Sequence, residues 1–151
     1  KVNKEKVTHV FFYGAGCGGE DSKLKYSNNI GESSFLYEVF GAAGFPIDPE
    51  RGMVLVDVLN PSLEDPETGA DLIGSVVYLN SEHEKSLVLD DDTRELQEGN
   101  VLGQHSDVIF LNVTPGELEF NIETPDGSSC VYPSRMLSHA NEIFHISVYC
   151  Q

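Results

Sequence analysis

The sequence predicts an all-β protein, an antiparallel β-sandwich of about 7–8 strands with one short helix over residues 33–43. From residue 52 onward, β-branched and aromatic runs recur at intervals of about ten residues. Clusters of Gly, Pro, Asn and Asp separate these runs, as expected for turns. Residues 117–123 alternate strictly between acidic or polar and apolar side chains, which is typical of a half-buried strand.

The length of 151 residues, 40% of them hydrophobic, suits a single core. We expect one compact unit, in which residues 52–151 form the sandwich and residues 1–51 lead into it. In that lead-in, the β-branched and aromatic run 7–13 predicts a strand, and the glycine-rich residues 14–32 predict a loop. Apolar residues at helical spacing follow, and Gly44 before Pro46 provides a stop signal for the helix.

The first strand of the sandwich reads GMVLVDVLN and ends at Asn60, because the following Pro61 cannot donate to a sheet ladder. A turn is predicted at residues 67–69, and strands are predicted at 75–79 and 86–89. After a polar loop, the run 107–113 predicts a further strand that ends in the turn Thr114-Pro115-Gly116.

The next strand has its core face defined by alternation, with Leu118, Phe120 and Ile122 pointing inward. A turn at 125–127 precedes a short strand at 129–132. The inward row of the last strand consists of Phe144, Ile146 and Val148.

The three cysteines are Cys17, Cys130 and Cys150, and no two of them have the C-x-x-C spacing of a zinc ribbon or a thioredoxin-type site. One disulfide and one free thiol fit an exported protein. We favour Cys130–Cys150, because their segments can be neighbours in a C-terminal hairpin. A Cys17–Cys150 bridge and three buried reduced cysteines are the alternatives. A lipid anchor at Cys17 is disfavoured, because the apolar stretch before it is too short.

The formal net charge of -16 and the pI near 4.4 argue against binding to nucleic acid or to anionic membrane surfaces. Residues 1–25 hold five lysines and three acids, and the remaining residues hold four bases and 22 acids. A slightly basic N-terminal arm therefore precedes a strongly acidic body. No apolar run reaches the roughly 20 residues of a transmembrane helix, so no transmembrane segment is expected.

Between residues 52 and 127 the order of strands and turn residues resembles that of the carboxypeptidase regulatory-like domains of the transthyretin-like superfamily. The residues that match the family pattern are Thr68, Gly69, Leu72, Gly74, Val77, Leu79, Phe110, Val113, Pro115, Gly116 and Ile122. The family's Asp-x-x-Gly element has only a displaced counterpart at Asn100–Gly103. The resemblance implies a transthyretin-like or Ig-like sandwich in an exported bacterial protein, located outside the cell, at its surface or in the periplasm. The matching residues are structural, so they assign no functional site.

Two metal hypotheses arise. The consecutive Asp90, Asp91 and Asp92 suit a calcium loop, since calcium takes six to eight oxygens, but the EF-hand pattern is absent and a solvated charge run is the alternative. Intradiol dioxygenases resemble transthyretin-like sandwiches and bind iron through two tyrosines and two histidines. That resemblance implies Tyr78, Tyr132, His139 and His145 as candidates, although the family's His-x-His pair is missing. No other cofactor is expected.

The function we expect is that of a non-catalytic exported module that binds or assembles. Its expected partner is a protein, either a different protein or a second copy of this chain. The N-terminal strand, with Val7, Val10, Phe11, Phe12 and Tyr13, can add to the sheet edge of an acidic neighbour. Pairing of this strand within its own chain is the alternative. Asn112-Val-Thr is a glycosylation sequon by pattern only, and Pro115 behind it disfavours its use.

Overall fold

The computed structural model describes residues 10–14, 40–60, 70–132 and 136–151, and the predicted all-β sandwich is confirmed. Within these residues the chain forms twelve strands and a helical turn at residues 40–42. The strands are β1 (Val10–Gly14), β2 (Gly52–Asn60), β3 (Ala70–Asp71), β4 (Val76–Leu79), β5 (Lys85–Asp90), β6 (Leu96–Glu98), β7 (Ser106–Val113), β8 (Gly116–Leu118), β9 (Phe120–Glu123), β10 (Cys130–Val131), β11 (Met136–Ser138) and β12 (Ile143–Cys150).

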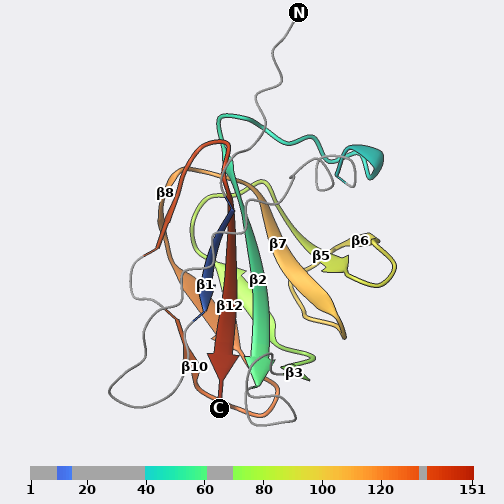
Figure 1. The fold of residues 1–151 in the computed structure, drawn as a ribbon, viewed down its shortest axis with the longest axis vertical. Coiled ribbons are helices and arrows are strands. Elements are labelled where there is room, and N and C mark those ends of the chain that lie inside the picture. Colours follow the sequence, from blue (N-terminus) through green and yellow to red (C-terminus); the bar gives the residue numbers. More distant parts are fainter. Residues whose placement is uncertain (1–9, 15–39, 61–69, 133–135) are drawn as a thin grey trace, which may run out of the picture.

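The main sheet has the order β1-β12-β2-β7-β5-β6, and Figure 1 shows β1, β12 and β2 side by side. β3 and β10 pair with the ends of β2 and β12, respectively. β12 runs parallel to both β1 and β2, so the sheet is mixed rather than wholly antiparallel. Side-chain alternation has the same period in both arrangements, which is why it did not predict the direction of β12.

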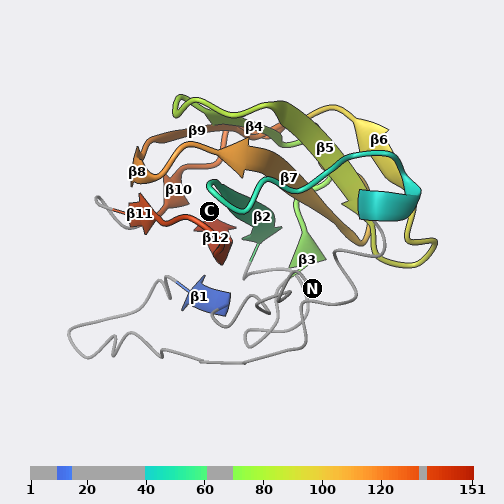
Figure 2. The same cartoon turned by 90° about the horizontal axis from the view of Figure 1, so that it is seen from above.

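Two small sheets, β4-β9 and β8-β11, pack against one face of the main sheet. Figure 2 shows β4 and β9 as a layer separate from β2 and β12. The core between the layers includes Val54, Val56 and Val58 of β2. It also contains Phe144, Ile146 and Val148 of β12, which confirms the predicted inward row. Burial of each such side chain contributes about 1.5–3 kcal/mol.

The alternating run 117–123 is divided between two strands, because β8 pairs with β11 and β9 pairs with β4. Its predicted inward residues are confirmed, since Leu118 and Phe120 are buried and Ile122 packs against the core. Gly116, at the end of the predicted turn, has a φ of 148°, which glycine tolerates best. The acidic segment 90–98 is only partly a loop, because Leu96–Glu98 forms β6 and pairs with β5.

A second apolar cluster covers the opposite, outer face of the main sheet. It contains Met53 and Leu55 of β2 and the buried Phe40 of the helical turn, together with Leu87, Leu89, Ile109, Leu111 and Ile143. Figure 2 shows this turn beside β5 and β6. Strand β2 is therefore buried on both faces, which explains its nearly continuous apolar sequence. The remainder of the predicted helix, residues 33–39, lies outside the described residues.

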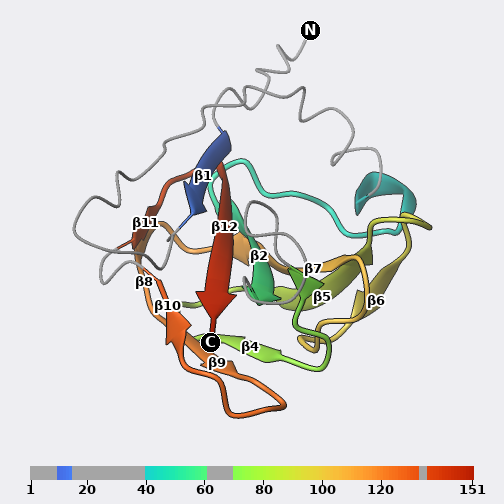
Figure 3. The same cartoon turned by 60° about the horizontal axis from the view of Figure 1, so that its bottom comes forward.

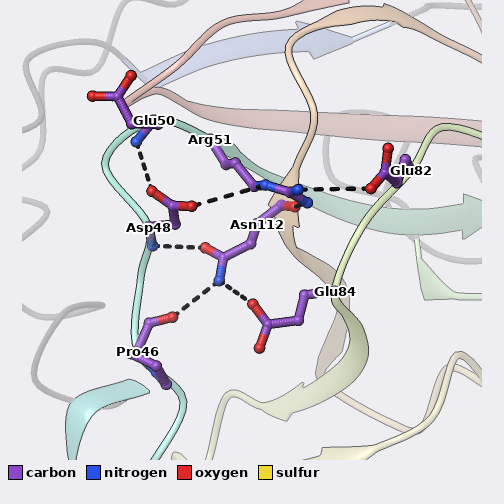
Figure 4. A network of polar contacts seen from close by, with 7 residues as sticks. All are labelled: Pro46, Asp48, Glu50, Arg51, Glu82, Glu84 and Asn112. Atoms are coloured by element: carbon purple, nitrogen blue, oxygen red, sulfur yellow. Dashed lines mark hydrogen bonds and ion pairs between the residues drawn. The ribbon is translucent and has the colours of Figure 1, made fainter.

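A polar network around Asn112 fastens residues 46–51 to this outer face (Figure 4). Asn112 has a φ of 54° at an irregularity between β2 and β7. Its Oδ1 accepts a hydrogen bond from the Asp48 amide at 2.8 Å, and its Nδ2 donates to Pro46 O at 3.0 Å and to Glu84 Oε2 at 2.7 Å. The Asn112 side chain is thus fully engaged, and the residue is 2% exposed. The sequon at Asn112 is consequently inaccessible to glycosylation in the folded protein.

Arg51 extends this network across the loop that precedes β5. Its guanidinium donates to Asn112 O at 3.1 Å and lies 3.6 Å from Glu82 Oε1 and 3.8 Å from Asp48 Oδ2. The lead-in segment and the sandwich are therefore connected by both apolar and polar contacts.

The predicted Cys130–Cys150 disulfide is confirmed, and it joins β10 to the end of β12. Figure 3 shows these two strands meeting beside the C-terminus. Cys17 lies outside the described residues. Within the described part of the chain, no helix is long and apolar enough to cross a membrane.

Candidate functional site

Two carboxylates and one imidazole form a polar cluster on the outer face of the main sheet, at one end of the strands that carry the apolar cluster on this face. It consists of Asp57 on β2, Asp107 on β7 and His145 on β12, three strands that are neighbours in the main sheet. One donor atom from each side chain lies within 4.8 Å of the other two. Among the described residues, no other group of three His, Cys, Asp or Glu side chains has this proximity.

Sheet register brings the three side chains together. Asp57 pairs with Ser147, and His145 lies two residues earlier on β12, so the two side chains share a face. Val56 pairs with Val108 in the antiparallel ladder, and its next step places Asp107 opposite Asp57. The cluster is therefore positioned by strands rather than by loops, which limits its freedom to rearrange.

His145 and Asp57 form the closest contact in this cluster, with Nε2 and Oδ1 3.3 Å apart. Their side chains are only 21% and 19% exposed. Burial lowers the pKa of His145, but the Asp57 contact and the charges of Asp57, Asp107 and Asp91 outweigh it, so that this pKa is raised above its usual value. The pKa of Tyr149 is raised as well, by burial and then by the negative charge of Asp57.

Of these three residues, His145 alone was predicted from the sequence as a candidate metal ligand. A signal was present in two of the three strands, since Asp57 interrupts the apolar run of β2 and His145 interrupts that of β12. A polar side chain in a strand that is buried on both faces needs a partner. The pattern does not reveal that these partners are each other, because this depends on which strands are neighbours.

The acidic run 90–92 is engaged in local structure. Asp90 Oδ1 accepts hydrogen bonds from the Asp92 and Thr93 amides at 2.9 and 2.8 Å. The Thr93 amide bond is the main reason that the pKa of Asp90 is lowered. Asp92 Oδ2 lies 3.0 Å from His105 Nδ1. These contacts describe a capped turn, and they add no support for the calcium hypothesis.

The four residues proposed as iron ligands lie on different surfaces. Tyr78 is 39% exposed on β4, whose neighbouring residues Val77 and Leu79 face the core. Tyr132 packs against the core between the sheets, and its hydroxyl donates to Phe120 O at 3.1 Å. His145 lies on the outer face of the main sheet, and His139 is exposed after β11. This geometry gives no support to an iron site made of these side chains.

The predicted assembly strand is present as β1, except for Val7, which lies outside the described residues. It pairs in parallel with β12 of its own chain, from Val10 opposite Ile143 to Gly14 opposite Ser147. Intrachain pairing, the alternative to strand donation, is therefore the arrangement in this structure.

The fold and the cluster define the class of protein as a two-layer, disulfide-linked β-sandwich with a carboxylate–imidazole cluster on its outer face. No family model, curated protein or solved structure matches the chain. The likeness to carboxypeptidase regulatory-like domains remains a prediction from the sequence.

Proposed function

We propose that this protein is a non-catalytic exported binding module that assembles with further copies of itself by strand addition. The observation that carries the proposal is the attachment of β1. Within the described residues, β1 pairs with β12 alone, and it occupies one end of the main sheet. Its place can be taken by the equivalent strand of a second copy, because the backbone hydrogen bonds would be the same.

Chain length supports this exchange. Gly14 of β1 is joined to Phe40, the next described residue, through residues 15–39. An extended chain spans at most about 3.3–3.6 Å per residue, so 25 residues provide a reach of up to about 80–90 Å. That reach exceeds the distance between the sheet edges of two touching domains of this size.

Charge supports the same arrangement. Residues 1–25 carry two more bases than acids, whereas the remainder carries 18 more acids than bases. Two acidic bodies repel each other, and an exchanged basic arm would reduce that repulsion at the contact. The Cys130–Cys150 disulfide fits the oxidising location that export implies.

Native mass spectrometry of three chains tests the proposal. The full chain is expected to form multiples of the monomer mass in a concentration-dependent way. A variant lacking residues 1–9, which keeps β1 but loses three lysines and one acid, is expected to do so only at higher concentration. A variant lacking residues 1–14 is expected to remain monomeric. A full chain that stays at its 16.6 kDa monomer mass at every concentration, or a truncation of 1–14 that assembles like the full chain, would contradict it.

A further inference from the structure

We propose that Asp57, Asp107 and His145 form a binding site for a divalent first-row transition metal ion, with zinc as its representative. The proposal concerns the outer face of a single chain, so it is independent of strand exchange. The three donor atoms come from adjacent strands and lie within 4.8 Å of one another.

The distances suit one shared ion. Zinc binds imidazole nitrogen at about 2.0–2.1 Å and carboxylate oxygen at about 2.0–2.2 Å. Two donors around a tetrahedral zinc are therefore about 3.4 Å apart. His145 Nε2 and Asp57 Oδ1 are 3.3 Å apart in the structure, and the Asp107 donor atom lies within 4.8 Å of both, so a bound ion would draw it closer.

The charges of the cluster also favour a bound cation. Two aspartates at opposing positions on neighbouring strands repel each other, and like charges in this arrangement destabilise a sheet. A divalent cation balances two carboxylates, while a neutral imidazole contributes a nitrogen ligand. One nitrogen and two oxygens favour a transition ion over calcium, which binds through oxygen.

The surroundings of the three ligands determine the coordination, burial and rigidity of the proposed site. Three protein ligands leave one position of a tetrahedral ion for water or an exogenous ligand. The side chains of Asp57 and His145 are about four-fifths buried, so the ion would be held at a partly dry surface rather than in solvent. Backbone pairing of β12, β2 and β7 holds the three ligands at fixed spacing.

Isothermal titration of the metal-stripped protein with zinc, together with the visible spectrum of its cobalt complex, tests the site. The wild-type chain is expected to bind one ion per chain and to give the cobalt bands of a low-coordinate site. The variants Asp107→Asn and His145→Gln are expected to lose at least about 100-fold in affinity, since even outer ligand partners contribute 10–100-fold. The matched control is His105→Gln, which removes the exposed histidine beside Asp92 and is expected to bind zinc like the wild type.

Circular dichroism of each variant establishes that the sandwich is folded before binding is compared. If His145→Gln does not fold, Asp107→Asn provides the comparison, because its side chain has nearly the same shape. Absence of a one-to-one zinc complex in the wild type would overturn the proposal. Equal affinity of the wild type and a folded Asp107→Asn variant would overturn it as well.

Discussion

At the scale of single residues, Asn112 connects the lead-in segment to the sandwich through side-chain hydrogen bonds. Its side chain bonds to the backbone on one side and to Glu84 on the other, while its own backbone adopts a positive φ. Asparagine tolerates this conformation better than most residues. The residue therefore satisfies a backbone requirement and a hydrogen-bonding requirement at once.

Two substitutions separate these requirements. Asn112→Gly keeps the backbone conformation but removes three side-chain hydrogen bonds, so we expect a loss of about 1–3 kcal/mol in the free energy of unfolding. Asn112→Ala adds backbone strain and is expected to cost roughly 1 kcal/mol more. Urea unfolding measures both changes. Asn121→Ala, at an exposed position of β9, is the control, and equal stability of Asn112→Gly and this control would contradict the account.

Asp90 provides a prediction that depends on pH. Its pKa is lowered in the folded protein, so its stabilising effect is present above the unfolded pKa of 3.8 and is lost as the pH falls through the folded value. Asp90→Ala is therefore expected to be less stable than the wild type at neutral pH, with a smaller difference at acidic pH below 3.8. Urea unfolding at both pH values measures it. A stability difference that is the same at both would show that the carboxylate charge is not responsible.

The candidate metal site could not be predicted from the sequence, although much of the core could. Two inward rows could be predicted, because burial on one face imposes a period of two on the side chains. They are Leu118, Phe120 and Ile122 of β8 and β9, and Phe144, Ile146 and Val148 of β12. The meeting of Asp57, Asp107 and His145 could not be predicted. It depends on β2 lying between β12 and β7, and no local pattern in the sequence encodes that strand order.

At the scale of elements, the start of β2 is constrained by a close backbone approach. A Cβ atom on Gly52 would lie 2.8 Å from His139 O, at the irregular step between β2 and β7. This contact is with backbone rather than with a flexible side chain, so it cannot be relieved by rotation. The apolar run predicted β2 itself. The contact at Gly52 could not be predicted, because it is made by the segment that precedes β12, which is distant in the sequence.

Gly52→Ala is accordingly expected to destabilise the fold by about 1–3 kcal/mol through overpacking. Gly41→Ala is the matched control, because a Cβ there has no atom within 4 Å. Since residue 41 is helical, that substitution is expected to increase stability by about 0.4–1 kcal/mol. Thermal unfolding of the two variants measures the opposite signs, and a Gly52→Ala variant as stable as Gly41→Ala would refute the argument.

At the scale of the whole molecule, the sequence predicted a sandwich, its disulfide and an N-terminal strand, all of which the structure contains. It could not determine which strand β1 pairs with, because a five-residue apolar strand fits many sheet edges. The structure identifies that edge as β12. The same pairing can be made within a chain or between chains, and the proposed function depends on the second.

Cysteine trapping distinguishes these two pairings most directly. Gly14 and Ser147 are partners across β1 and β12, and neighbouring strands lie about 4.7–4.9 Å apart, within the range a disulfide bridges. We would mix equal amounts of Gly14→Cys and Ser147→Cys chains, both carrying Cys17→Ser, at working concentration and oxidise them. The account predicts a covalent dimer linked between positions 14 and 147. A cross-link that forms within the Gly14→Cys/Ser147→Cys double variant but never between the mixed chains would contradict it.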